Sequence, residues 1–60
     1  MLKIKQLRLK RKMRQADLAK ALNVGRATVA DWERGASYPR TSMLPAVAKI
    51  LKCKIDDLFA

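Results

Sequence analysis

The chain has 60 residues, with 14 Lys or Arg against 5 Asp or Glu, so its formal net charge is +9. A domain of this length buries only about 60% of the surface that its unfolded chain exposes, which favours a binding surface over an enclosed catalytic pocket. The positive charge indicates an anionic partner, of which nucleic acid is the commonest, although a basic face can also simply be solvated.

The residues on which metal sites and enzymes depend are scarce in this sequence. Cys53 is the single cysteine and histidine is absent, so neither an internal disulfide nor a Cys/His metal site is expected. Without a nucleophile–base pair or a glycine-rich phosphate loop, we expect no enzyme, no cofactor and no small-molecule ligand. Lysines interrupt the apolar N-terminus and no apolar run approaches a membrane span. The composition is compatible with a cytoplasmic protein in which Cys53 is a small core residue.

The first predicted element is an amphipathic helix that begins near Ile4 and ends near Lys12, with Leu7 on its apolar face. Met13 is expected to place an apolar side chain under the turn that follows. Cations are concentrated here, and those that precede the first acidic residue, Asp17, are Lys3, Lys5, Arg8, Lys10, Arg11, Lys12 and Arg14. This uneven distribution favours a binding role over a uniformly solvated surface.

Residues 15–35 have the apolar spacing of two short helices. Leu18 and Leu22 stand four apart, and Val29 and Trp32 stand three apart, so each pair lies on one face of its helix. Such a face must be buried, and we therefore expect both pairs to pack in the core. Trp32 is accordingly predicted to be a core residue and not a base-stacking one.

The segment between these two helices is suited to a tight turn. Asn23 tolerates a left-handed backbone and Gly25 can cap the second helix, so the chain can reverse within about three residues. The small Ala19 lets the two helices approach closely where they cross. Together these residues predict a helix-turn-helix, which is a motif typical of DNA binding.

The remaining residues predict two further helical segments. After an irregular stretch over residues 36–42, Thr41 or Ser42 can cap a fourth helix that has Pro45 in its first turn. Its apolar positions are Leu44, Val47, Ala48 and Leu51. A short final helical turn contains Ile55, Leu58 and Phe59, with Asp56 and Asp57 near its N-terminus. No strand of useful length is predicted.

The sequence QADLAKALNVGRATVADWERG, residues 15–35, resembles the Cro and phage-repressor (XRE-like) helix-turn-helix family. The likeness extends to other positions, namely Arg8, Tyr38-Pro39, Leu44, Ala48, Leu51 and Asp57-Leu58-Phe59. It implies an all-α, compact five-helix, lambda-repressor-like fold over residues 1–60. It also implies a domain that binds operator DNA, usually as a dimer, to control transcription.

Three positions depart from the family pattern. Arg14 stands where the family usually has a Ser or Thr cap, and losing a cap costs about 1 kcal/mol, part of which Asp17 can offset. Lys12 stands where the family often has Gly, so helix one is expected to carry slight strain or to end differently. Asn23 replaces the usual turn Gly, which is a mild change.

The residues expected to face DNA bases lie at the start of the second motif helix, residues 26–34. The candidates are Arg26, Ala27, Thr28 and Asp31. Arg26 can donate two hydrogen bonds to guanine, although a phosphate contact or a solvated cation is the alternative, and the methyl groups of Ala27 and Thr28 can meet thymine. Asp31 can accept from cytosine or pair with Arg34 on the helix surface, and the pairing is favoured.

Other residues are expected to hold the DNA backbone or the fold. The resemblance implies that Gln15 binds a phosphate at the start of the first motif helix. The other predicted phosphate contacts are Arg14, Arg34, Ser37, Tyr38 and Arg40, with Arg11 and Lys12 as weaker candidates. The resemblance also implies a structural ion pair between Arg8 and Glu33.

The predicted partner is a double-stranded, palindromic operator, and a homodimer is expected to read it. Ile55, Leu58 and Phe59 are the candidate dimer contacts, or they simply close the monomer core. With no effector domain after residue 60, we expect a stand-alone regulator encoded by a bacterium or phage, for which an antitoxin or restriction-modification controller is a variant. The alternative is a protein-interaction or RNA-binding module on the same fold.

Overall fold

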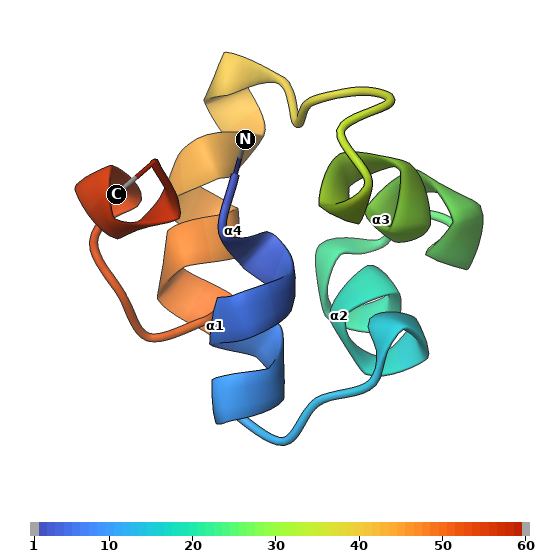
Figure 1. The fold of residues 1–60 in the computed structure, drawn as a ribbon, viewed down its shortest axis with the longest axis horizontal. Coiled ribbons are helices and arrows are strands. Elements are labelled where there is room, and N and C mark those ends of the chain that lie inside the picture. Colours follow the sequence, from blue (N-terminus) through green and yellow to red (C-terminus); the bar gives the residue numbers. More distant parts are fainter. Residues whose placement is uncertain (1, 60) are drawn as a thin grey trace.

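The computed structural model describes residues 2–59 and, within that range, is all-helical with no strand. Its four α-helices are α1 (Ile4–Lys10), α2 (Gln15–Leu22), α3 (Arg26–Glu33) and α4 (Leu44–Ile50). Two short 3-10 turns accompany them, η1 (Thr41–Met43) before α4 and η2 (Ile55–Leu58) after it. In Figure 1, α2 and α3 lie together on one side of the molecule, and η2 lies at the opposite edge from α3.

The predicted count of five helices is wrong by one, because the last element is a single 3-10 turn. In η2, the N–H of Asp57 donates to the carbonyl of Lys54 at 3.0 Å, and that of Phe59 to the carbonyl of Asp56 at 3.1 Å. These i→i+3 bonds span four residues, which is the usual length of a 3-10 segment.

One apolar core is formed by residues from every α-helix and from η2. Ile4, Leu18, Val29 and Leu58 have no exposed surface, and Trp32 is only 3% exposed, which confirms that its role is in the core. The remaining buried apolar residues are Leu2, Ala19, Val47, Ala48 and Leu51. Helix α2 packs most extensively on α3, as a helix-turn-helix requires. None of the helices within residues 2–59 is long and apolar enough to cross a membrane.

All four α-helices end in the same backbone arrangement, a left-handed residue followed by a residue whose N–H reaches back into the helix. The left-handed residues are Lys12 (φ 56°), Asn23 (φ 59°), Gly35 (φ 80°) and Lys52 (φ 55°). At the end of α1, for example, the N–H of Met13 donates to the carbonyl of Arg8 at 3.1 Å, and that of Lys12 to the carbonyl of Leu9 at 2.9 Å. This pair of bonds is a Schellman motif, which satisfies carbonyls that the helix itself leaves without donors.

The expected strain at Lys12 is therefore present, since a side chain on a left-handed backbone costs free energy that glycine avoids. It also explains why α1 ends at Lys10 and not near Lys12. Lys52 has the same conformation, which the sequence reading did not identify. The signal was the similarity of the two connectors, in which a Lys is followed by a half-buried residue, Met13 or Cys53, and then by a cation.

Helix starts rely on carboxylates and backbone more than on hydroxyl caps. Asp17 accepts a hydrogen bond from the Arg14 backbone N–H at 2.9 Å, which offsets the missing Ser or Thr cap as expected. Gly25 is the N-cap of α3, with an extended backbone. The expectation that Thr41 or Ser42 caps the fourth helix is wrong: both lie inside η1, and α4 begins after Met43 without a side-chain cap bond.

Candidate nucleic-acid interface

Behind the exposed face of α3, a buried ion pair fixes the end of that helix. Arg8 donates to both carboxylate oxygens of Glu33, from Nε at 2.6 Å and from Nη2 at 3.0 Å, and its Nη1 donates to the Met13 carbonyl at 2.7 Å. The side chains of Arg8 and Glu33 are only 8% and 5% exposed. The pair that the resemblance implied is thus present, and it ties α1 to α3.

Gln15 takes part in the same network, which sequence reasoning did not foresee. Its Nε2 donates to Oε1 of Glu33 at 3.0 Å, so the first residue of α2 is joined to the last residue of α3. Burial of the Glu33 carboxyl group raises its pKa, whereas the hydrogen bonds that Arg8 and Gln15 donate to it lower the pKa. The lowering effects together are larger, so the pKa of Glu33 lies below its ordinary value. One hydrogen of the Gln15 amide remains available for a phosphate.

The exposed side of α3 carries the residues predicted to face bases. Val29 is fully buried on the other side of the helix, whereas Arg26 and Ala27 are exposed and Thr28 is half-buried. Gly25, in front of them, adds no side chain that would keep another molecule away from the start of the helix.

Two hollows flank α3, one on each side of these residues. The first hollow is lined by Gln15, Arg26, Ala27 and Ala30. It continues into a neighbouring depression that also contains Gln15 and Arg26 and that reaches Arg14. The second hollow lies between Thr28 and the loop after α3, where Ser37, Tyr38 and Arg40 line it. Arg26, Ala27 and Thr28 therefore line hollows shared with two groups of predicted phosphate contacts, Arg14 and Gln15 in one and Ser37, Tyr38 and Arg40 in the other, whereas Asp31 and Arg34 line neither.

Four of the six arginines have their guanidinium groups bonded within the protein. In addition to Arg8, these are Arg11, Arg14 and Arg34. Arg26 and Arg40 make no such hydrogen bond within residues 2–59, and both are exposed. These two guanidinium groups are consequently the ones most available to an outside acceptor.

The bonded arginines differ in what they hold. Arg11 donates to the carbonyls of Leu51 at 3.0 Å and Lys52 at 3.2 Å, so it closes the end of α4 and is a poor candidate for a phosphate contact. Arg14 pairs with Asp17 at 3.2 Å through a side chain that is 84% exposed. The Arg14 side-chain hydrogen bond, followed by that from the Arg14 backbone, lowers the pKa of Asp17.

Asp31 and Arg34 form the surface pair that the sequence favoured. Nη2 of Arg34 donates to Oδ1 of Asp31 at 2.7 Å, and the two side chains are 70% and 40% exposed. Ion pairs this exposed contribute about 0–1 kcal/mol, so a phosphate or a base could replace either partner at little cost.

The three candidate dimer residues do not share one environment. Leu58 is fully buried in the monomer core, which confirms the second of its two predicted roles, closing the core, and makes a dimer contact wrong, because exposing it would require the core to open. Ile55 and Phe59 are 38% and 59% exposed.

The sequence model of the helix-turn-helix family matches residues 4–58, and the chain therefore belongs to this family. Three relatives illustrate its range. The chain is 34% identical to the HTH-type transcriptional activator BcrR of Enterococcus faecalis over 97% of its length, and 38% identical to repressor protein C2 of Salmonella phage P22 over 93%. It is 39% identical to multiprotein-bridging factor 1c of Arabidopsis thaliana over 90%. The chain spans 28%, 26% and 36% of these three proteins, respectively.

Proposed function

We propose that this chain is a sequence-specific DNA-binding regulator of transcription of the Cro and phage-repressor type, and that α3 lies in the major groove of its operator. The observation that carries the proposal is the guanidinium group of Arg26, which makes no hydrogen bond within residues 2–59. It stands at the exposed start of α3, on a helix whose other face is anchored by Val29 and Trp32.

In this proposal, bases are read by the first turn of α3. Arg26 forms a bidentate pair with guanine, while Ala27 and the methyl group of Thr28 contact thymine. Asp31 is less suited to reading because Arg34 already occupies its Oδ1. Asp31 contacts a base only where the amino group of a cytosine takes the place of Arg34 as its hydrogen-bond donor.

Phosphates on the two sides of the groove are bound by separate parts of the chain. On one side, Gln15 offers its remaining amide hydrogen and the N-terminus of α2, with Arg14 beside it. On the other side, Arg40 supplies a guanidinium that bonds to nothing within residues 2–59, with Ser37 and Tyr38 as further donors. Arg34 contributes if it leaves Asp31.

One α3 helix reads only a few base pairs, so we propose that two copies occupy a palindromic site with their helices about 34–36 Å apart. Ile55 and Phe59 are the remaining candidates for contact between the copies. One relative is named an activator and another a repressor, so the proposal concerns DNA reading and leaves open the direction of regulation. The expected compartment is the bacterial cytoplasm, where such DNA lies.

Selection of bound duplexes from a random pool tests the proposal. We expect a palindromic consensus to be enriched, with half-sites one helical turn apart, and a control selection with Arg26→Ala to lose preference at one base pair of each half-site. An unchanged consensus for that variant would contradict the role of Arg26.

The second candidate is a protein-interaction or RNA-binding module, and the bridging factor among the relatives is the observation that favours it. Failure of the wild-type chain to enrich any duplex, combined with a folded protein by circular dichroism, would support this candidate over DNA reading. The small side chains around Arg26 favour DNA reading over this second candidate, because they allow a duplex to approach α3 closely.

A further inference from the structure

The hollow between α3 and the loop after it has a lining that phosphate binding alone does not explain. A phosphate needs cations and hydrogen-bond donors around it, yet more than half of the lining residues are apolar or aromatic. The hollow measures about 440 Å³, a size typical of small-molecule sites. We call it the loop-side hollow, and its apolar and aromatic residues are Val24, Trp32, Tyr38, Pro39 and Met43.

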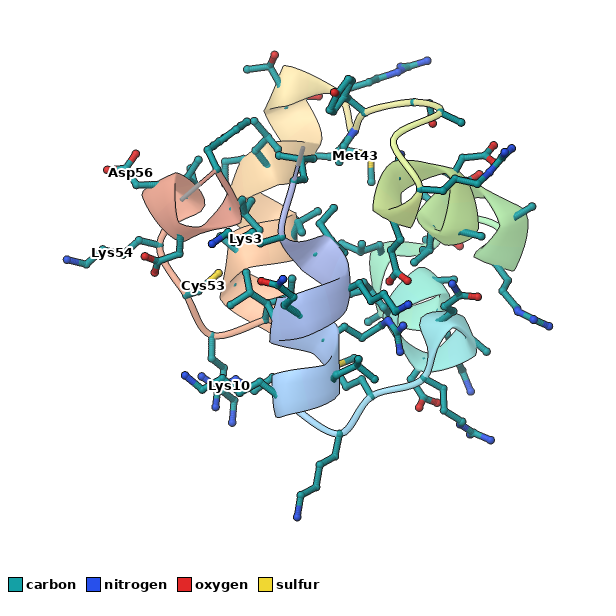
Figure 2. All side chains as sticks on the ribbon, in the orientation of Figure 1. Lys3, Lys10, Met43, Cys53, Lys54 and Asp56 are labelled. Atoms are coloured by element: carbon teal, nitrogen blue, oxygen red, sulfur yellow. The ribbon has the colours of Figure 1, made fainter. Side chains whose placement is uncertain are left out.

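These five residues give the loop-side hollow an apolar floor and an aromatic edge. Trp32 and Pro39 are buried, and Val24 and Met43 are half-buried, so they form its base. The side chain of Met43 lies between η1 and α3 in Figure 2. Tyr38 is 62% exposed and stands at the edge. A flat apolar body that enters the hollow can therefore pack on Met43 and beside the ring of Tyr38.

The single charged residue that lines the loop-side hollow is a cation. Arg40 is exposed, and its guanidinium makes no hydrogen bond within residues 2–59. No carboxylate lines the hollow beside it. A guanidinium can donate two parallel hydrogen bonds to a carboxylate, a geometry that an ammonium group cannot match. The apolar floor and the guanidinium together favour a ligand that is flat, apolar and ends in a carboxylate.

The depression that reaches Arg14 has a lining better suited to phosphate. Its volume is similar, at about 420 Å³, but Arg8, Arg14, Arg26 and Gln15 are among its lining residues and no aromatic residue is. The loop-side hollow differs because it can select a ligand by its ring as well as by its charge.

The wall that the loop contributes to the hollow can move at little cost. The N–H of Ser37 donates to the Asp31 carbonyl at 3.4 Å, and that of Met43 donates to the Arg40 carbonyl at 2.8 Å. Between these two bonds, neither Tyr38 nor Arg40 donates its backbone N–H to another group within residues 2–59. Few hydrogen bonds oppose a shift, so this segment can adjust around a ligand.

We infer that the loop-side hollow binds a planar aromatic carboxylate. The ring packs on Met43 beside Tyr38, and the carboxylate accepts two hydrogen bonds from Arg40. Thr28 also lines the hollow. Because Thr28 and Arg40 are proposed contacts to DNA, the ligand and the duplex occupy the same space, and each lowers the affinity for the other. The binding step stands without the proposed function, whereas the competition with DNA rests on it.

No small-molecule ligand was expected from the sequence. The lining residues are spread over positions 24–43 and follow no motif of their own. They come together only because the loop folds back beside α3.

NMR titration of the methionine methyl signals at 150 mM NaCl tests the binding step. The probe is 1-naphthoate, and 1-naphthalenemethanol and inorganic phosphate are the arms that lack its charge and its ring, respectively. We expect 1-naphthoate to shift the Met43 signal with a dissociation constant of about 1 mM, the affinity of a ligand with roughly thirteen non-hydrogen atoms. The other two compounds should bind about 10-fold more weakly, because each lacks one of the two interactions. Met13 lines the depression that reaches Arg14, so its signal is the internal control.

Two outcomes of this titration would overturn the inference. The first is that 1-naphthoate leaves the Met43 signal in place, or shifts the Met43 and Met13 signals alike, at about ten times the expected dissociation constant. The second is that phosphate binds as tightly as 1-naphthoate, which would mean that the hollow holds only a phosphate group.

Paired substitutions test which side chains bind the probe. Arg40→Gln should weaken 1-naphthoate about 10-fold and leave the alcohol unaffected, because only the carboxylate uses the guanidinium. Lys49→Gln, which removes one positive charge from α4, is the control. Tyr38→Ser should weaken both compounds, and Phe59→Ser, at another ring that is 59% exposed, should weaken neither. Equal losses for Arg40→Gln and Lys49→Gln would contradict the inference, because net charge alone would then explain the binding.

Competition for a duplex that carries the selected half-site tests the link to DNA. With 1-naphthoate at about ten times its dissociation constant, the apparent dissociation constant for the duplex should rise about 10-fold, as mutual exclusion requires. The same concentration of added NaCl is the control for ionic strength. Loss of duplex binding in the wild type without the probe would contradict the proposed function. A probe that binds at Met43 without weakening duplex binding would contradict only the competition.

Discussion

Arginine has opposite roles on the two sides of α3. Arg8 is buried, and its three nitrogens donate to Glu33 and to the Met13 carbonyl. Arg26 is exposed and bonds to no acceptor within residues 2–59. The first guanidinium fixes the angle of the helix, and the second is left available by the same fold.

The comparison shows that charge alone does not identify a binding residue. A desolvated cation is destabilising unless its donors are satisfied, so Arg8 could not leave Glu33 for a phosphate without a large penalty. An exposed cation has no such requirement. The internal hydrogen-bond pattern is therefore a better guide to the interface than the number of basic residues on it.

The largest expected effect comes from breaking the buried side. Glu33→Ala leaves the Arg8 guanidinium buried without its carboxylate, and we expect a loss of about 3–5 kcal/mol in the free energy of unfolding, measured by urea titration. Replacing both residues, as Arg8→Met with Glu33→Leu, should recover most of that loss because no charge is then buried. A cost below about 1 kcal/mol for Glu33→Ala would mean that the pair resembles a surface one.

The next effect concerns the open side. Arg26→Ala should reduce discrimination at one base pair by about 1–3 kcal/mol while leaving the thermal unfolding curve unchanged, since the side chain supports nothing internal. Its control is Arg40→Ala, which should weaken binding to all sequences alike and lower the salt slope by about 1. Equal losses on specific and random duplexes for Arg26→Ala would assign it to a phosphate.

The pH response distinguishes the two sides again. Because the pKa of Glu33 in the folded chain lies below its ordinary value of 4.5, its contribution to stability is complete above that value and is lost as the pH falls through the lower folded pKa. Unfolding of wild type and Glu33→Gln, followed from pH 7 to pH 3, should give a difference that shrinks towards the acid end. A constant difference would show that the carboxylate charge does not matter.

The smallest expected effect concerns Lys12, which differs from both Arg8 and Arg26 because its backbone is left-handed. Lys12→Gly should stabilise the domain by up to about 1 kcal/mol, because relief of the strain exceeds the extra entropy of the unfolded chain. Calorimetry would record a melting temperature a few degrees higher. Lys10→Gly, at the last residue of α1, should instead destabilise the domain, by less than the roughly 1 kcal/mol that glycine costs in a helix interior.

The sequence contained enough information for most of the fold. Periodicity identified α2 and α3 because their buried pairs, such as Val29 and Trp32, follow the helical repeat. It did not give the length of the last element, since Ile55 and Leu58 suit a 3-10 turn as well as a helix. Nor did it reveal the contact between Gln15 and Glu33, because residues 18 apart in the chain are joined only by the packing of α2 on α3.

For the candidate site, the sequence predicted the exposed start of α3 and the pairing of Asp31 with Arg34, but it did not identify every cation that is bonded within the protein. Arg11 and Arg40 look alike in the sequence, and only the structure shows that Arg11 donates to the carbonyls of Leu51 and Lys52. Leu58 was assigned to the surface and to the core with equal reason, because an apolar residue in a short turn fits both until its packing is known.

All four α-helices are closed at their C-terminal ends by backbone hydrogen bonds, which allows the side chains at the left-handed positions to vary. Because backbone N–H groups close each helix, the exposed side chains of Lys12 and Lys52, at the left-handed positions, are not needed for capping. We expect that substitutions at these two positions can tune the ionic strength over which the protein works while leaving its core untouched. The domain can therefore adapt to a different salt concentration through substitutions at its helix ends.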